Sequence, residues 1–219
     1  MGKISILTKE QQAFLSVLRQ NSYITKNFYF TGGTALSEYY LHHRYSEDID
    51  LFSESKIDTD IINTLVHDWS KKLHFTFSSN FIEVVYRFNC IFKNGYELKV
   101  DFAYYPYKRI QPSQMINGLP VDSLFDIAVN KTNTLSQRQS IKDFVDCYFL
   151  WQTESFSDLV HGIEIKFHEE FDPMIFSSNL LSVEYFDVLP KMLKPLQLSD
   201  LKSYFRKKAV ELAKKSVEL

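Results

Sequence analysis

The feature that most restricts the fold is a glycine pair, Gly32-Gly33, placed between two segments of different pattern. The aromatic-rich residues 27–31 predict a short strand. Thr34 and the apolar residues after it predict a helix that ends near residues 42–44. Backbone N–H groups at such a turn favour phosphate, and glycine lets phosphate approach the backbone closely. The pattern also suits an ordinary tight turn, so the glycines identify a binding site only in combination with other motifs.

Two acidic residues, Asp48 and Asp50, follow this segment. Residues 48–52 alternate acidic and apolar side chains, which predicts a strand with both carboxylates on one face. Two unit charges about 4 Å apart repel by roughly 4 kcal/mol at an effective dielectric near 20, and a bound divalent cation reverses this. Magnesium prefers such hard oxygen ligands. An exposed polar strand is the alternative, but the order glycine pair, helix, acidic pair is more specific than either motif alone.

A third carboxylate, Asp101, lies on a predicted hairpin. Residues 84–92 and 96–105 read as strands joined through Asn94-Gly95, a strong hairpin signal. Apolar residues of the second strand are expected to face the core: Leu98, Val100 and Phe102. Lys99 and Asp101 then share the polar face. In two-metal phosphoryl transfer, Asp101 would bind the ion nearer the attacking hydroxyl and accept its proton. A solvated strand carboxylate is the alternative.

These three motifs together resemble the polymerase-beta-like nucleotidyltransferases. Residues 32–36 and 44–52 are similar, more narrowly, to the AbiEii/AbiGii toxin nucleotidyltransferases, a resemblance that covers about residues 28–150. It implies an enzyme that moves an NMP from an NTP to an acceptor hydroxyl with release of pyrophosphate. Asp48, Asp50 and Asp101 would be its catalytic residues and metal ligands, for two Mg²⁺ ions or Mn²⁺. Gly32, Gly33 and Thr34 would bind the nucleotide.

A downstream signature of the same group matches five positions: Lys131, Arg138, Lys142, Asp143 and Asp146. Lys131 and Arg138 are seven residues apart, so they share a helix face if the helix persists, and two cations can grip a triphosphate. Asp143 and Asp146 could orient Lys131 or contact the base or ribose. A solvated helix face is the alternative.

Two residues just before the acidic pair, Arg44 and Ser46, are further nucleotide-binding candidates. They could contact phosphate or hold the loop. His42 and His43 lack an acidic or cysteine partner nearby in the sequence, so we expect them at the surface rather than as metal ligands.

The remaining pattern predicts an α+β protein with a small mixed sheet, flanking helices and a helical C-terminal region. Helices are expected at residues 8–20, from about Asp58, at 124–135, at 140–149 and from about Ser199. Residues 106–120 read as loop. We expect a nucleotidyltransferase core at 1–115 and a helical domain at 116–219 that completes the nucleotide site.

Composition narrows the class of protein. Hydrophobic residues make up 45% and aromatic residues 16% of 219, which indicates a folded globular protein. The net charge of -2 neither implies nor excludes a nucleic-acid partner.

The two cysteines show no disulfide or metal spacing, and no run approaches the roughly 20 apolar residues of a membrane span. We expect a cytoplasmic protein without a targeting segment or membrane partner. The basic last helix reads as a solvated face, with RNA contact as the alternative.

The resemblance also implies a toxin of a toxin–antitoxin or phage-defence system, with the 3′ end of tRNA as acceptor and a cognate antitoxin as partner. Two alternatives stay open. The acceptor could be a protein or a small molecule, or the chain could be a non-catalytic nucleotide-binding module, which the intact Asp48, Asp50 and Asp101 disfavour. The preferred NTP and the oligomeric state cannot be read from spacing.

Overall fold

The computed structural model describes residues 5–217, and side chains through residue 214. Residues 1–4, where no targeting segment was expected, and the side chain of Lys215 in the basic last helix lie outside the described part. The chain divides into two compact units. The sheet unit comprises the described part of Met1–Tyr40, Ser46–Lys108 and Pro112–Ser123, and the helical unit comprises Leu41–Tyr45, Arg109–Gln111 and the described part of Leu124–Leu219.

The sheet unit is built on a mixed seven-stranded sheet of order β3-β4-β5-β2-β1-β7-β6. Its strands are β1 (Tyr29–Thr31), β2 (Ile49–Ser53), β3 (Phe75–Ile82), β4 (Val85–Phe92), β5 (Glu97–Tyr104), β6 (Gln114–Ile116) and β7 (Leu119–Val121). β2 pairs with β5 and β1 with β7 in parallel, and the other pairs are antiparallel. The expected mixed sheet is confirmed.

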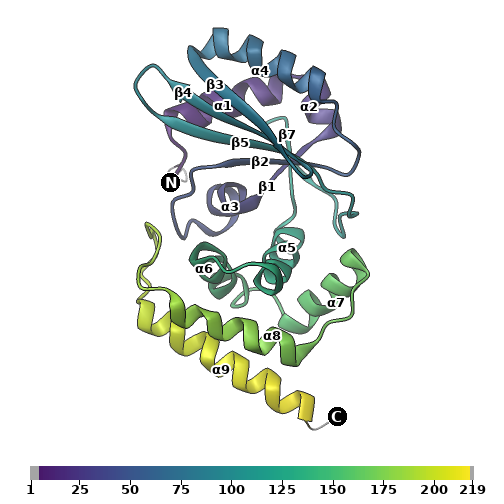
Figure 1. Cartoon of the computed structure of the whole chain (residues 1–219), viewed down its shortest axis with the longest axis vertical. Helices are drawn as coiled ribbons and strands as arrows, with labels where there is room; N and C mark the ends of the chain where they lie inside the picture. The colour runs from purple at the N-terminus through teal and green to yellow at the C-terminus, as the bar shows by residue number, and fades with distance from the viewer. Residues whose placement is uncertain (1–4, 218–219) are drawn as a thin grey trace. The chain divides into compact units, whose positions relative to one another are not determined.

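Helices cover both faces of this sheet (Figure 1). α1 (Lys9–Gln20), α2 (Ser22–Asn27) and α4 (Thr59–Leu73) lie on one face, and α3 (Gly32–Ala35) lies on the other. Phe28, next to α2, packs edge-on against Phe102 of β5 with ring centroids 5.4 Å apart. Leu98, Val100 and Phe102 are buried, as expected. The apolar side of β5 therefore faces the helix layer, which directs Lys99 and Asp101 to the opposite face.

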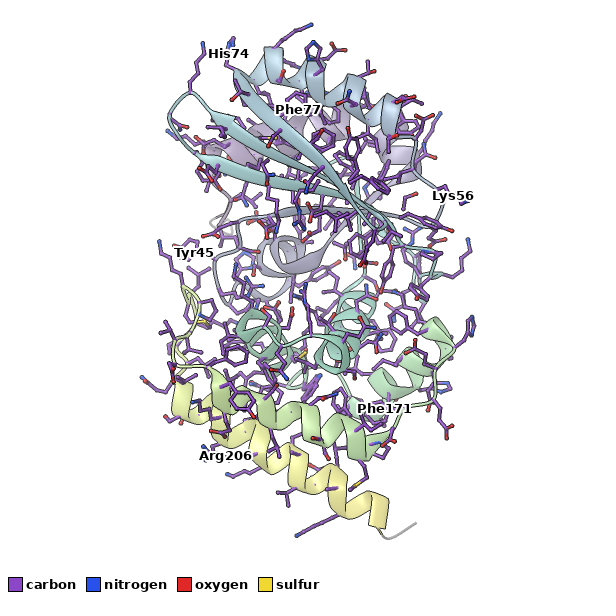
Figure 2. All side chains as sticks on the ribbon, viewed as in Figure 1. Tyr45, Lys56, His74, Phe77, Phe171 and Arg206 are labelled. Carbon is purple, nitrogen blue, oxygen red and sulfur yellow. The ribbon has the colours of Figure 1, made fainter. Side chains whose placement is uncertain are left out.

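The predicted starts of α1 and α4 are confirmed by their caps. Thr8 and Gln11 form a reciprocal capping box at α1. The Asp58 carboxylate accepts from two backbone N–H groups at the start of α4, and His74, labelled in Figure 2, follows α4 with a left-handed φ of 58°. α2 was not expected, because six residues are too few to show a helical period.

The segment after β1 differs from the expectation. The glycine pair lies inside α3 rather than before it, so Thr34 is not the N-cap. A π-helix, η1 (Leu36–Leu41), continues the segment. The Thr34 hydroxyl instead donates to the backbone carbonyl of Asp48. A tertiary hydrogen bond therefore replaces the predicted local one.

One strand was not predicted and one other expectation was wrong. The edge strand β3 was missed because most of its side chains are exposed, so it lacks the alternation that marks a half-buried strand. Residues 106–120 were expected to be loop, but they contain β6 and β7. Asn117 and Gly118 join these strands with φ of 50° and 82°, values typical of a tight hairpin turn. The sheet unit consequently extends to Ser123, beyond the expected limit at residue 115.

The helical unit contains α5 (Leu124–Gln137), α6 (Ile141–Leu150), α7 (Phe156–Phe167), α8 (Pro173–Leu180), the 3-10 helix η2 (Leu181–Tyr185) and α9 (Leu198–Val217). Trp151 lies in its aromatic core. The Trp151 ring centroid is 4.9 Å from that of Phe156 and 5.3 Å from that of Phe205. Arg206 of the basic helix α9, labelled in Figure 2, pairs with Glu184. No helix in residues 5–217 has the length and hydropathy of a membrane span.

Candidate active site

Two of the predicted metal ligands, Asp50 and Asp101, occupy directly paired positions of the parallel strands β2 and β5. Because side chains alternate along each strand, paired residues point to the same face of the sheet. Ile49 and Leu51 on either side of Asp50 are fully buried. The structure therefore brings these two carboxylates together on the face that carries α3.

Asp48 lies one residue before β2 rather than within it. Its carboxylate is 2.7 Å from Nζ of Lys99, and both side chains are about one-third exposed. Lys99 is two residues before Asp101 on β5, so it shares that residue's face. The ion pair with Lys99 therefore holds the Asp48 carboxylate on the same face of the sheet as Asp101.

Asp101 is held by an arginine that the motif analysis did not select. Arg87 lies directly opposite Asp101 on the antiparallel strand β4. Its Nε and Nη2 donate to the two carboxylate oxygens of Asp101 at 2.8 and 2.7 Å. This hydrogen bonding raises the pKa of Arg87, and the nearby charges of Asp48 and Asp50 act in the same direction. The guanidinium therefore interacts electrostatically with all three carboxylates.

The glycine pair approaches this site through Gly32. Its φ of +75° is in the left-handed region that favours glycine. A Cβ built on Gly32 would overlap Oδ2 of Asp50 and stand 2.9 Å from its Cγ. The first glycine is therefore required both by the backbone conformation and by the close approach of the Asp50 side chain.

The donor chemistry of this face suits a magnesium ion, because carboxylate oxygens are the ligands that Mg²⁺ prefers. Among residues 5–217, no group of three or more His, Cys, Asp or Glu side chains is arranged to hold a metal ion. Lys99 and Arg87 instead contact Asp48 and Asp101. The residues fit the metal in chemical type and in shared face, and their assignment as ligands stays a prediction.

A second group of predicted residues meets inside the helical unit, around Asp146 of α6. Arg44 donates from Nε and Nη2 to the two oxygens of Asp146 at 2.7 and 2.8 Å. His43 Nε2 lies 2.7 Å from Oδ1 of Asp146. Arg44 is 1% exposed and His43 is fully buried. The expectation that His43 lies at the surface was therefore wrong, because its acidic partner is distant in sequence.

Lys131 of α5 joins this cluster from the other side. Its Nζ is 2.6 Å from Oδ1 of Asp143 and 2.7 Å from Oδ2 of Asp146. Burial opposes ionisation of Asp146, but the charges of Lys131 and Arg44 hold its pKa well below the ordinary value. Both aspartates are buried, so the alternative of a solvated helix face is excluded. They orient Lys131, which is one of the two roles considered.

Arg138, just after α5, donates from Nε to Oδ2 of Asp143 at 2.9 Å while its side chain stays 67% exposed. Ser140 is the N-cap residue of α6 but its side chain makes no capping hydrogen bond. Lys142 is exposed. The backbone carbonyl of Ser46, in the sheet unit, accepts from Nε2 of Gln11. Nucleotide binding by these residues stays a prediction.

Arg87 and His43 are the residues of these clusters that sequence reasoning missed. A usable signal existed for Arg87, since pairing the two strands of the predicted hairpin places it near Asp101. The exact register depends on the length of the connecting loop. In the structure Ile91 pairs with Glu97, which places Arg87 opposite Asp101. No local signal existed for His43.

The fold is that of the nucleotidyltransferases. MenT4, a nucleotidyltransferase toxin from Mycobacterium tuberculosis H37Rv, superposes with a TM-score of 0.58 at 15% identity, over 93% of this chain and 84% of that one. JHP933 from Helicobacter pylori gives a TM-score of 0.54 at 19% identity, over 96% of this chain and 93% of that one. At these identities the likeness shows the fold alone.

Residues 14–208 match the family described as nucleotidyl transferase AbiEii toxin of type IV toxin–antitoxin systems. The chain therefore belongs to the AbiEii family of nucleotidyltransferase toxins. It is also similar to an uncharacterized protein of Aquifex aeolicus (strain VF5), with 28% identity over 185 residues that cover 83% of this chain and 84% of the relative.

Proposed function

We propose that this nucleotidyltransferase toxin transfers a nucleoside monophosphate from an NTP to a hydroxyl, with the 3′ end of tRNA as the acceptor. The observation that carries the proposal is the pairing of Asp50 with Asp101 across β2 and β5, with Asp48 on the same face. Family membership supports the transfer chemistry and a cognate antitoxin as partner. The choice of tRNA rests on the resemblance.

In the proposed reaction, the acceptor hydroxyl oxygen attacks the α-phosphorus, and the bond to the pyrophosphate leaving group breaks. Asp101 accepts the hydroxyl proton. Asp48, Asp50 and Asp101 are the residues that would hold magnesium, which when bound supplies charge neutralisation for the triphosphate. Gly32 is the proposed phosphate contact at the start of α3, whereas Gly33 and Thr34 are buried.

The buried cluster around Asp146 supports a positioning role for Arg44 and Lys131 in the helical unit. Lys131 donates to Asp143, Arg44 donates to Asp146 and to the backbone carbonyl of Tyr45, and Arg44 is almost fully buried. Arg138 and Lys142 are more exposed. We therefore propose Arg138 and Lys142 as the first candidates for phosphate contact among the downstream residues.

A labelled-NTP experiment tests the proposal. The wild-type protein, the double variant Asp48→Ala/Asp50→Ala and the control Asp68→Asn are incubated with each labelled NTP, magnesium and total cell extract. Asp68 is exposed on α4, which covers the other face of the sheet. We expect wild type and Asp68→Asn to label RNA of tRNA size and the double variant to label nothing.

Three other outcomes would change the assignment. Label on protein or on a small molecule would replace the acceptor while leaving the chemistry intact. Magnesium-dependent NTP binding without turnover on any acceptor would indicate a binding module. Transfer by the double variant at the wild-type rate would remove the carboxylate face from the mechanism.

A further inference from the structure

The Arg87 guanidinium binds both carboxylate oxygens of Asp101, in a two-pronged (forked) arrangement. Both oxygens accept a hydrogen bond from the guanidinium, at 2.8 and 2.7 Å. The Asp101 side chain is 9% exposed and that of Arg87 is 32% exposed. Paired N–H···O bonds between arginine and a carboxylate are among the stronger hydrogen bonds in proteins. Any cation that binds Asp101 must therefore displace or share at least one of these bonds.

The arginine also faces the other two carboxylates. The charges of Asp48 and Asp50 act on the Arg87 guanidinium together with that of Asp101. The lysine beside it, Lys99, contacts Asp48 at 2.7 Å. The sheet thus supplies two cations on the same face as the acidic residues, Arg87 from β4 and Lys99 from β5.

We propose that Arg87 competes with the divalent metal ion for Asp101, and so sets how tightly the free enzyme binds metal. The inference rests on the proposed function, because it takes Asp101 to be a metal ligand. When no metal is bound, Arg87 and Lys99 offset part of the negative charge of the three carboxylates, and Arg87 releases Asp101 when a metal ion binds. It is a positioning residue that acts through Asp101, and it raises the metal concentration that the enzyme requires.

This role predicts an effect opposite to that of an ordinary structural contact. Removing a structural support of Asp101 would loosen the carboxylate and weaken metal binding. Removing a competing cation leaves a nearly buried carboxylate without its arginine, which strengthens metal binding. The sign of the change in metal affinity therefore separates the two roles.

The test measures Mn²⁺ binding by electron paramagnetic resonance of the free ion, without nucleotide, for wild type and three variants. Arg87→Met removes the charge and the fork. Arg87→Lys keeps a charge without the fork. Lys93→Met removes one positive charge from an exposed turn position of the same hairpin.

We expect Arg87→Met to bind Mn²⁺ about tenfold more tightly than wild type, from the strength of a hydrogen bond between charged groups. The Mn²⁺ affinity of Arg87→Lys should lie between those of wild type and Arg87→Met, and the affinity of Lys93→Met should equal that of wild type. The magnesium concentration for half-maximal transfer should fall in the same order. Circular dichroism and thermal unfolding establish that each variant is folded.

Equal or weaker Mn²⁺ binding by folded Arg87→Met would overturn the inference. If Arg87→Met does not fold, Arg87→Lys decides, and affinity no higher than wild type contradicts the competition. Asp50→Asn separates this failure from failure of the proposed function. Loss of Mn²⁺ binding in Asp50→Asn shows that the metal site stands even when Arg87 has no effect. Unchanged binding in Asp50→Asn, or no binding by wild type and Arg87→Met alike, removes the metal site and the inference with it.

Discussion

Gly32 and Asp50 stand so close that the Asp50 carboxylate occupies the space of a Cβ on Gly32. The glycine has a φ of +75°, and the aspartate lies on β2, which pairs directly with β5 so that Asp50 is next to Asp101. This contact couples the backbone after β1 to the position of a predicted metal ligand. A side chain at residue 32 would have to move that carboxylate.

Gly32→Ala is expected to abolish nucleotide transfer. Gly95→Ala is the matched control, because Gly95 has a φ of +80° but no atom within 4 Å of its Cβ position. Both variants should lose about 1–2 kcal/mol of stability from the left-handed backbone. Only Gly32→Ala should lose activity, and equal transfer rates for the two variants would contradict the role of the Asp50 contact.

Asp146→Asn should destabilise the helical unit strongly. The change removes the negative charge that Arg44 and Lys131 share, while Arg44 stays buried and the Lys131 side chain is only 11% exposed. Breaking a buried ion pair from one side costs about 3–5 kcal/mol. Urea unfolding measures the loss, with the exposed Asp187→Asn as control. A loss below about 1 kcal/mol, the range of surface ion pairs, would show that the cluster is hydrated.

Folding stability should fall as the pH drops below about 6.5, the ordinary His value, because of His43. Burial lowers the pKa of His43 in spite of its bond to Asp146. The unfolded chain therefore binds a proton at a pH where the folded chain does not, so acidification favours unfolding. Urea midpoints between pH 7.5 and 5.5 measure the slope. His43→Gln should flatten it, whereas the exposed His67→Asn should leave it unchanged. A slope unaffected by His43→Gln would assign the dependence to other groups.

The two cysteines should not react with a thiol reagent while the protein is folded. Burial raises the pKa of Cys90 to about 12 and that of Cys147 well above its ordinary value, and both side chains are fully buried. The thiolate is the reactive form, so both conditions slow the reaction. Absorbance with Ellman's reagent should show no release until urea unfolds the chain. Fast reaction of the native protein would indicate local opening around α6 or β4.

Much of the sheet could be predicted because its signals are local. Alternation marked β2 and β5, the Asn94-Gly95 turn marked β4 as the hairpin partner of β5, and helix caps marked α1 and α4. Elements without a local signal were missed. β3 has mostly exposed side chains, and β6 and β7 are three residues each, which is too short for a period to appear.

The sequence by itself indicated the three carboxylates that we propose as the catalytic residues and metal ligands of the acidic face. Asp48, Asp50 and Asp101 were selected from their order and spacing. Strand alternation correctly placed Asp50 and Asp101 on the polar faces of their strands, whereas Asp48 lies one residue before β2. The same motifs indicated the nucleotidyltransferase family, which the match over residues 14–208 shows.

Only the tertiary structure decided the partners of these residues. The register of β4 against β5 sets Arg87 on Asp101, and the packing of α5 and α6 with residues 41–45 sets Lys131, His43 and Arg44 on Asp146. Such pairs join positions up to 103 residues apart. No local propensity encodes them, because an ion pair between distant residues depends on packing that the whole unit makes together.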